Sequence, residues 1–137
     1  MIEVIHDCAE HARQPLVRGM FADRKRLFID LYGWDLPASE GRYEVDQYDT
    51  ADTLYIIVAN EAGEHDASIR LMPTTVPHML ADIFPHLCPT GVPVGPDIWE
   101  SSRLCLPQRH GAEGRRVAIR RKPPCGGGEG AVLRVLV

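Results

Sequence analysis

The feature that most constrains the fold is an unbroken apolar run at Leu54–Ala59. A run of this length, bounded by turn residues, is typical of a central strand covered on both faces of a sheet. The polar residues that follow it predict a turn, and residues 67–72 predict a return strand, so the two strands form a hairpin. In the return strand Arg70 shares one face with Ser68 and Met72, because side chains alternate along a strand.

Other elements are predicted around this hairpin. Residues 2–5 and 98–106 predict strands, residues 13–31 predict a helix that ends at Gly33, and a second, short helix starts at Pro77 and runs to residue 84. The long helix is predicted because its apolar residues recur at the spacing of one helical face. These residues are Val17, Met20, Phe21, Leu27, Phe28 and Leu31. A chain of 137 residues suits one domain of the α/β class.

One arginine lies within the apolar stripe of the long helix. Arg24 is four residues from both Met20 and Phe28, so its side chain leaves the helix on the same face. Either it extends along the stripe to place its charge in water, or it points into a binding cleft. The spacing alone favours neither alternative.

Two opposite charges lie inside the last predicted strand. In an ideal strand Glu100 and Arg103 face opposite sides, because they are an odd number of residues apart. If both line one cleft, a β-bulge is needed between them, and we expect it at Ser101-Ser102. The alternative is an ordinary salt bridge at the end of the strand.

The charge distribution divides the chain near residue 110. Residues 1–110 hold 9 Lys/Arg and 17 Asp/Glu, whereas residues 111–137 hold 6 and 2 of these and half of the 12 glycines. We expect the basic, Gly/Pro-rich residues 111–137 to be a disordered tail. The first residues lack the pattern of a secretion signal and no apolar run is long enough to span a membrane, so we expect a cytoplasmic protein. The four scattered cysteines predict neither a disulfide framework nor a metal site.

Four segments carry a more specific signal. They are Arg24-x-x-x-Phe28 with Gly33-Trp34, then Glu44-Val45-Asp46-Gln47-Tyr48-Asp49, then Arg70-Leu71-Met72-Pro73-Thr74-Thr75 leading through Pro77-x-Met79-Leu80 to Ile83-Phe84-Pro85, and finally Ile98-Trp99-Glu100-Ser101-Ser102-Arg103. In this order and at these spacings they resemble the acyl-homoserine-lactone synthase (autoinducer synthase) family. The resemblance covers about residues 1–110, which we interpret as the N-terminal region of such a synthase.

This resemblance implies both a fold and a reaction. The fold is the GNAT-like acyltransferase architecture, a twisted mixed β-sheet with packed helices and a cleft for the acyl donor. In the reaction, the amine of S-adenosyl-L-methionine attacks the thioester of an acyl-carrier protein or acyl-CoA. The methionyl carboxylate then displaces methylthioadenosine and closes the homoserine lactone, a quorum-sensing signal. S-adenosyl-L-methionine is therefore a substrate, and no cofactor is implied.

The resemblance also implies roles for nine residues. Glu100 is the expected catalytic base, since a carboxylate within reach of the amine can take its proton. The eight residues expected to bind substrate are Arg24, Phe28, Trp34, Asp46, Asp49, Arg70, Phe84 and Arg103.

The charge and shape of these eight side chains suggest which part of the substrate each one binds. The two aspartates hold the ammonium and the sulfonium-bearing substrate, and Arg24 and Arg103 pair either with the substrate carboxylate or with those acids. Phe28 and Trp34 wall the adenosyl pocket, where a cation–π contact to the sulfonium is possible. Arg70 braces the acidic loop, and Phe84 packs near the acyl path.

The sequence departs from the family after about residue 110. Family members continue with further helices and strands, whereas this chain continues with arginine pairs, Pro123-Pro124 and a glycine triplet. A reading-frame shift in the gene would produce this pattern. We therefore expect an apparently C-terminally truncated chain whose last strand has an unpaired edge, with poor solubility and little synthase activity.

Two other functions compete with this interpretation. A generic GNAT-type N-acyltransferase would use acyl-CoA on another amine, but the acidic loop and Trp34 argue against it. A nucleic-acid-binding module would use the basic tail, but the acidic main region and the lack of a nucleic-acid motif argue against that. A non-catalytic remnant of a synthase is the third possibility.

Overall fold

The computed structural model describes residues 1–7, 11 and 14–107. Its elements in chain order are β1 (Ile2–His6), α2 (Pro15–Arg24), the π-helix η1 (Lys25–Leu31), β2 (Ala38–Ser39), β3 (Tyr43–Glu44), β4 (Leu54–Ala59), β5 (His65–Pro73), α3 (Met79–Asp82), the 3-10 helix η2 (Pro85–Leu87) and β6 (Trp99–Cys105). The tail expected to be disordered, residues 111–137, lies outside the described residues. None of the helices described here is long and apolar enough to cross a membrane.

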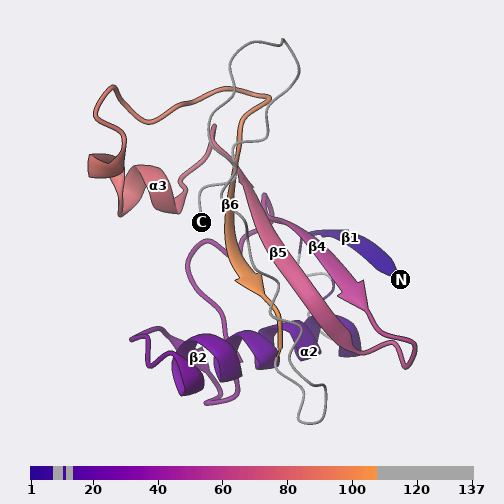
Figure 1. The fold of residues 1–137 in the computed structure, drawn as a ribbon. Coiled ribbons are helices and arrows are strands. Elements are labelled where there is room, and N and C mark those ends of the chain that lie inside the picture. The colour runs from indigo at the N-terminus through magenta and orange to yellow at the C-terminus, as the bar shows by residue number, and fades with distance from the viewer. Residues whose placement is uncertain (8–10, 12–13, 108–137) are drawn as a thin grey trace, which may run out of the picture.

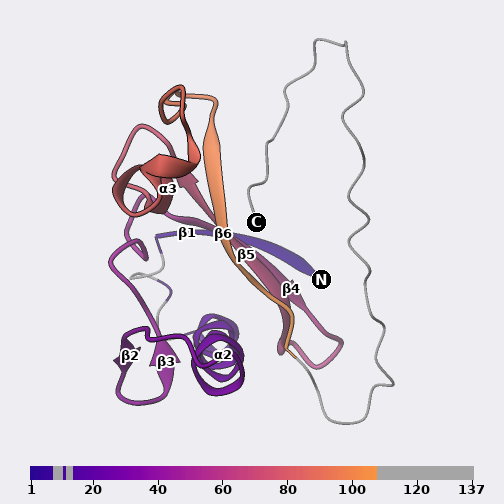
Figure 2. The same cartoon turned by 60° about the vertical axis from the view of Figure 1, so that its left-hand side comes forward.

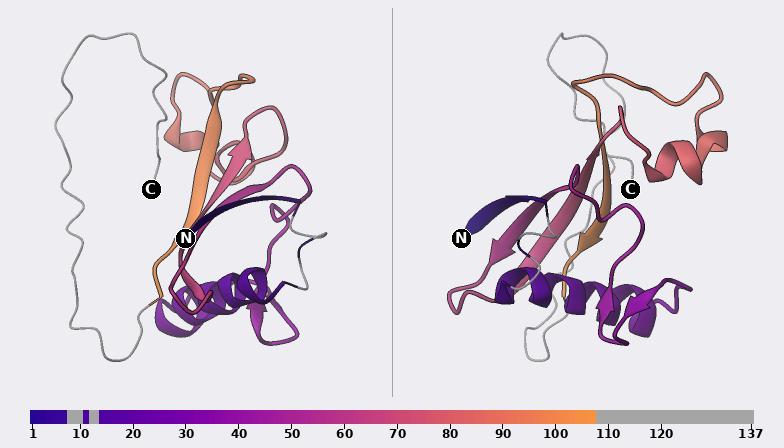
Figure 3. Two further views of the ribbon diagram at one scale, coloured as in Figure 1. Left: turned by 90° about the vertical axis from the view of Figure 1, so that its right-hand side faces the viewer. Right: turned by 180° about the vertical axis from the view of Figure 1, so that it is seen from behind.

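The four long strands form one sheet in the order β1-β4-β5-β6, and each neighbouring pair is antiparallel. Strands β1 and β6 lie at its opposite edges (Figure 3). Helices α2 and α3 both lie on one side of this sheet, with the small β2–β3 hairpin beyond α2 (Figures 1 and 2). The predicted α/β class and the predicted hairpin of β4 and β5 are confirmed.

The core lies between α2 and the sheet because both present apolar side chains to the same layer. Pro15 starts the helix at a position where its missing N–H costs nothing. The buried cluster consists of Ile5, Leu16, Val17, Met20, Phe21, Tyr55, Ile57 and Ala59. Burying such side chains stabilises the fold by roughly 1.5–3 kcal/mol for each large one.

The opposite face of the sheet is less covered by the described residues than the sequence predicts. Leu54, Ile56 and Val58 are only half-buried, and the neighbouring Ile2 and Val4 are exposed. The expectation that β4 is covered on both faces is therefore met on one face, where α2 packs. The alternation along β5 is confirmed, since Ser68, Arg70 and Met72 are buried on the α2 side.

The predicted helix over residues 13–31 changes type at Lys25. The ten α-helical residues of α2 continue into the wider turns of η1, and Gly33 ends the helix with a φ of +69°. Leu27 and Phe28 stay buried, but Leu31 is exposed, so its expected place on the apolar face is wrong. The wider turns rotate Leu31 away from the stripe that α-helical spacing predicts.

The short helix predicted from Pro77 is shorter than expected. It comprises only Met79–Asp82, because His78 is extended, with φ of −147° and ψ of 159°. The polar stretch after Trp34 also contains the β2–β3 hairpin, which the sequence did not reveal. This hairpin places Glu44 against α2, where the side chain is fully buried.

The predicted bulge in the last strand is present, but further along the strand. Ser101 and Ser102 pair in register with Leu71 and Arg70, and the extra residue of β6 lies between Ser102 and Cys105. Arg103 within this bulge has a φ of +53°, the left-handed region that L-residues seldom adopt. The bulge puts Arg103 on the same side of the sheet as Glu100, which the unbroken alternation would prevent.

Substitutions at the two faces of the sheet test this placement of the core. Ile57→Ala removes a side chain with 0% exposure, and we expect it to lower the free energy of unfolding by about 2–5 kcal/mol through lost burial and the cavity left behind. Ile2→Ala, at a side chain that is 69% exposed, is the control and should change it by less than about 0.5 kcal/mol. Urea denaturation followed by circular dichroism measures both, and equal effects would contradict this core.

Candidate active site

Arg24 is the last residue of α2, and its side chain is buried rather than extended to water. Nε donates to Glu44 Oε2 at 2.6 Å, and the two terminal nitrogens donate to Asp49 at 2.9 and 3.0 Å. The guanidinium also lies 5.0 Å from the centre of the Phe21 ring. The alternative in which Arg24 extends to water is therefore wrong, and its partners are Glu44 of β3 and Asp49 of the following loop.

Two further arginines from the sheet bind the same loop. Arg70 Nη1 donates to Asp46 at 2.5 Å and to Asp49 at 3.0 Å, and its Nε donates to Ser102 Oγ at 3.0 Å. Arg103 Nη2 lies 2.7 Å from Asp46 and 3.1 Å from Glu44. The expectation that Arg70 braces the acidic loop agrees with these contacts.

These contacts close into a ring. Each carboxylate bridges two arginines, so charges alternate around the circuit Arg24, Glu44, Arg103, Asp46, Arg70 and Asp49. We call these six side chains the arginine–carboxylate ring. Its members come from α2, β3, the following loop, β5 and β6, so the ring joins five parts of the fold.

Three members of the ring, Asp49, Arg24 and Arg70, have pKa values shifted toward their charged forms. Burial alone would raise the pKa of Asp49. The positive charges of Arg24 and Arg70 lower it by more than burial raises it, so the pKa of Asp49 is well below its usual range. Burial likewise lowers the pKa of Arg24, yet the neighbouring Asp49 and Glu44 more than reverse this and raise it. Tyr55 adds a hydrogen bond from its hydroxyl to Asp49.

Aromatic side chains adjoin one side of the ring. Phe28 stacks on Trp34 with ring centres 5.1 Å apart and planes 9° apart, and Tyr32 tilts against both. The Arg103 guanidinium lies 5.7 Å from the centre of the Phe28 ring. Trp34 remains 48% exposed, so the predicted aromatic wall is assembled with one face open.

Glu100 lies beside the ring without joining it. Its Oε2 accepts a hydrogen bond from the Leu80 backbone N–H at 2.5 Å, while its Oε1 is buried and has no hydrogen-bond partner among the described residues. Met79, the residue before Leu80, links this carboxylate to the ring, because its sulfur lies 3.2 Å from Arg70 Nη2 and 3.8 Å from Arg103 Nη1. A buried carboxylate with one oxygen unengaged is suited to accept a proton.

The structure does not bring every predicted residue to this site. Phe84 is 38% exposed and its ring contacts His86 at a centre-to-centre distance of 6.3 Å. Glu44 and Tyr55, by contrast, belong to the site although the sequence did not assign them to it. Glu44 belongs to the acidic segment of residues 44–49, and Tyr55 is directly opposite Arg70 in the predicted hairpin, so both could have been found from their spacing.

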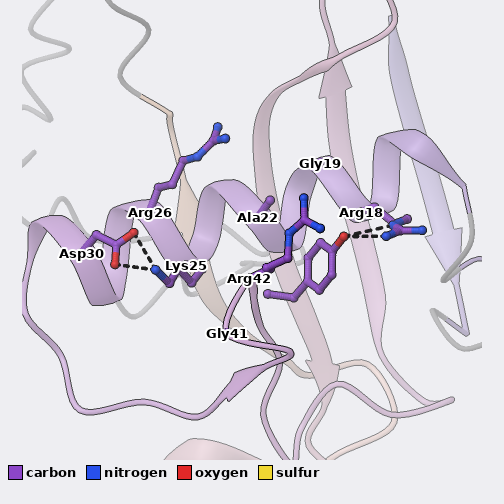
Figure 4. A pocket seen from close by; sticks show the side chains of 9 residues that line it. Arg18, Gly19, Ala22, Lys25, Arg26, Asp30, Gly41 and Arg42 are labelled. Atoms are coloured by element: carbon purple, nitrogen blue, oxygen red, sulfur yellow. Dashed lines mark hydrogen bonds and ion pairs between the residues drawn. The ribbon is translucent and has the colours of Figure 1, made fainter.

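A separate cavity lies between α2 and the β2–β3 turn (Figure 4). Its volume is about 410 Å³, and none of the nine predicted site residues lines it. Its charged side chains are partly satisfied, since Arg18 donates to the Tyr43 hydroxyl at 2.6 Å and Lys25 pairs with Asp30 at 2.7 Å. This cavity is therefore distinct from the ring.

Cys105 is a buried, free thiol on β6. Burial raises the pKa of the Cys105 thiol to about 12, so this sulfur stays protonated near neutral pH and is a poor nucleophile.

The ring predicts how stability depends on pH. Because the pKa of Asp49 is lowered in the folded chain, the unfolded chain binds its proton first as the pH falls below about 5. The stabilisation by Asp49 is therefore complete near neutral pH and is lost progressively on acidification. We expect Asp49→Asn to be less stable at pH 7 and to show a shallower loss of stability between pH 5 and 2, measured by urea denaturation at each pH.

The exposed acid Asp97 provides the matched control. Asp97→Asn should keep the pH dependence of the original chain. A slope for Asp49→Asn equal to that of the control would contradict the paired, charged state of Asp49.

Comparison with known proteins gives a consistent result. The family model described as autoinducer synthase matches residues 8–121. The acyl-homoserine-lactone synthase of Ralstonia nicotianae is 41% identical over 97 residues, which cover 69% of this chain and 47% of that protein. The isovaleryl-homoserine lactone synthase of Bradyrhizobium diazoefficiens is 38% identical over 105 residues, covering 75% and 47%. The chain thus spans about half the length of the curated relatives it matches.

Solved structures give the same picture of the fold. The CoA-dependent acyl-homoserine lactone synthase BjaI, solved with SAM and isopentyl-CoA, matches with a TM-score of 0.69 and 35% identity over 77% of this chain and 50% of that one. The synthase TofI, in a complex with an inhibitor and MTA, matches with a TM-score of 0.64 and 34% identity over 77% and 56%. These matches confirm the expected acyltransferase-type α/β fold. With a buried arginine–carboxylate ring on that fold and a family match over most of its length, the chain belongs to the autoinducer synthase family.

Proposed function

We propose that the protein provides the S-adenosyl-L-methionine side of an acyl-homoserine-lactone synthase. The reaction transfers an acyl group from an acyl-carrier protein or acyl-CoA to the amine of S-adenosyl-L-methionine, and lactonisation then releases methylthioadenosine. The observation that carries this proposal is the arginine–carboxylate ring, joined on one side to an aromatic wall and on the other to Glu100. The product serves as a quorum-sensing signal.

The burial of the ring members divides their proposed roles. The side chains of Asp46 and Arg103 are 9% and 6% exposed, whereas those of Glu44, Asp49 and Arg70 are 0–1% exposed. We assign substrate contact to Asp46 and Arg103, because they form the edge that a ligand can reach. The deeper members position these two, since their side chains pair with other members of the ring and are at most 1% exposed.

The wall and the base complete the proposed substrate site. The half-exposed Trp34, held in place by the buried Phe28 stacked against it, offers flat apolar surface to an adenine and an electron-rich face to a sulfonium. Glu100 offers one unengaged oxygen to the amine. The aspartate side chain at position 46 offers a second carboxylate to the positively charged substrate.

The proposed chemistry balances between two substrates. One proton of the substrate ammonium passes to Glu100, and the freed amine nitrogen forms a bond to the thioester carbonyl carbon. The carbon–sulfur bond then breaks, and the leaving sulfur takes a second N–H proton and departs as the thiol. The carboxylate oxygen then forms a bond to the carbon beside the sulfonium, and the carbon–sulfur bond to methylthioadenosine breaks. Because no electrons enter or leave, the reaction requires no redox cofactor, and we propose that none is used.

The relatives support this assignment. One matched synthase was solved with SAM and isopentyl-CoA and again with MTA, the product expected from lactonisation. We also propose a cytoplasmic location, since both proposed substrates are cytoplasmic metabolites. We propose that the acyl donor is a thioester of either acyl-carrier protein or CoA.

Ligand binding tests the proposal directly. Calorimetric titration of the 137-residue chain with S-adenosyl-L-methionine should give saturable binding. Mass spectrometry of mixtures with acyl-CoA or acyl-carrier protein then detects acyl-homoserine lactone and methylthioadenosine. Acylation of another amine without binding of S-adenosyl-L-methionine would favour the generic N-acyltransferase instead.

Replacement of the base tests its role. Glu100→Gln keeps the shape of the side chain but removes its negative charge, so we expect weaker binding of S-adenosyl-L-methionine and a fall in kcat at saturating substrate of about 10²–10⁴-fold. The control is Glu61→Gln in the exposed turn after β4, which should leave both quantities unchanged. Unchanged kcat in the Glu100 variant would exclude it as the base.

A further inference from the structure

The cavity between α2 and the β2–β3 turn gathers the positive side chains that the ring does not use (Figure 4). In the described part of the chain, every Lys or Arg side chain outside the ring lines this cavity, namely Arg18, Lys25, Arg26 and Arg42. They are gathered there although residues 1–110 hold 17 Asp/Glu against 9 Lys/Arg. A concave surface with an excess of one charge raises the local concentration of ions of the opposite charge.

The helix supplies three of these four cations. Arg18 and Lys25 are seven residues apart, about two helical turns, so their side chains leave the helix on the same face, and Arg26 follows directly. Ala22 lies between them along this face and contributes only a methyl group to the lining. The space between the cations is therefore left open by the helix.

The β2–β3 turn supplies the fourth cation. The Arg42 backbone N–H donates to the Ser39 carbonyl oxygen at 3.0 Å, which closes a four-residue turn. Gly41 in this turn has a φ of +63°, in the left-handed region that glycine adopts freely. Figure 4 shows the Arg42 side chain extending from the turn toward the helix near Ala22. A tight turn thus directs an arginine at the face that carries the other three cations.

Two of the four cations have no ion-pair partner among the described residues. Lys25 and Arg26 each pair with an aspartate, at 2.7 and 3.1 Å. Arg18 donates at 2.6 Å to the hydroxyl of Tyr43 rather than to a carboxylate. The side chain of Arg42 makes no hydrogen bond or ion pair within the described part of the chain. Two guanidinium groups at one cavity are therefore available to an anion.

We propose that this cavity is a second ligand site, which binds the phosphate groups of a small phosphorylated molecule. Guanidinium groups bind phosphate oxygens through paired hydrogen bonds. One phosphate monoester carries about 1.5–2 negative charges at neutral pH, which matches the two available guanidinium groups, whereas a carboxylate matches only one. The cavity volume of about 410 Å³ lies within the usual range of small-molecule sites.

The cavity is separate from the ring although the two share a helix and a strand. Lys25 directly follows Arg24, and Tyr43 directly precedes Glu44 in β3. Adjacent side chains of a strand leave it on opposite faces, so Tyr43 lines the cavity while Glu44 joins the ring. Binding at the cavity therefore requires neither the ring nor the proposed function.

Two sources can supply the phosphate groups, namely the nucleotide part of a CoA thioester and a free nucleotide. Both carry a diphosphate, and CoA adds a phosphate at the 3′ position of its ribose. ADP and 3′-phospho-ADP therefore distinguish the two sources, and inorganic pyrophosphate probes the group that they share.

The test titrates each of these three ligands into the full chain by calorimetry at about 0.15 M salt, which screens exposed charges more than about 8 Å apart. Arg42→Gln removes a guanidinium that contacts no other described side chain, and Arg26→Gln removes one that is 76% exposed. The matched control is Val94→Glu, which lowers the net charge by the same one unit at a loop side chain that is 64% exposed.

We expect pyrophosphate to bind saturably at one site. Arg42→Gln should weaken this binding about ten-fold, the loss of a hydrogen bond to a charged group, and Arg26→Gln should also weaken it. Val94→Glu should bind pyrophosphate as the original chain does. In NMR spectra the amide resonances of Gly41 and Arg42 should shift on addition of pyrophosphate. Tighter binding of 3′-phospho-ADP than of ADP would identify CoA as the source, and equal or weaker binding would identify a free nucleotide.

Three outcomes would overturn the site. Equal weakening by Arg42→Gln and Val94→Glu would mean that only the net charge matters. The absence of saturable binding would mean that the cations form an ordinary solvated surface. Binding of acyl-carrier protein that depends on Arg42, without binding of pyrophosphate, would make the cavity a protein-docking surface instead. A separate titration with S-adenosyl-L-methionine reports on the proposed function, so a chain that binds only one of the two ligands loses only the corresponding proposal.

Discussion

The fold on the α2 side of the sheet depends on a closed circuit of three arginines and three carboxylates. Taking six charges out of water is costly, and only mutual pairing offsets that cost. Removal of any one member leaves a buried charge short of a partner, which typically costs about 3–5 kcal/mol. The circuit therefore acts as a unit that fixes a helix, a hairpin and two strands relative to one another, more than as a source of stability.

Two departures from regular secondary structure make this circuit possible. The bulge in β6 turns Arg103 to the side on which Arg70 and Glu100 already lie. The π-helical turns after Arg24 keep Phe28 buried and against Trp34, so the aromatic wall follows directly from the helix that supplies the first arginine. Irregular backbone of both kinds is common at functional sites, where it aims side chains that regular elements would misplace.

The sequence predicted the elements well and the geometry between them less well. The strand at Leu54–Ala59 and the face of Arg70 follow from the apolar run and from alternation along the next strand, and both are confirmed, although β4 is covered on one face and not on two. The spacing of Glu100 and Arg103 predicted that a bulge was needed. The position of the bulge depends on the left-handed backbone of Arg103, and no glycine or asparagine in the segment indicates such a conformation. The partners of Arg24 could not be predicted from its position on an apolar stripe. The periodicity of a helix indicates which of its faces is buried, but not which side chains that face contacts. Glu44 reaches Arg24 through the β2–β3 hairpin, which the polar composition of that segment does not predict.

The backbone of Arg103 places two demands on one position. Its φ of +53° favours glycine or asparagine, which adopt this conformation at less cost than arginine does. The circuit, however, needs a guanidinium there, and neither of those residues carries one. Relief of backbone strain and completion of the circuit therefore favour different amino acids at position 103. The left-handed backbone of Arg103 is local strain that its ion pairs with Glu44 and Asp46 hold in place.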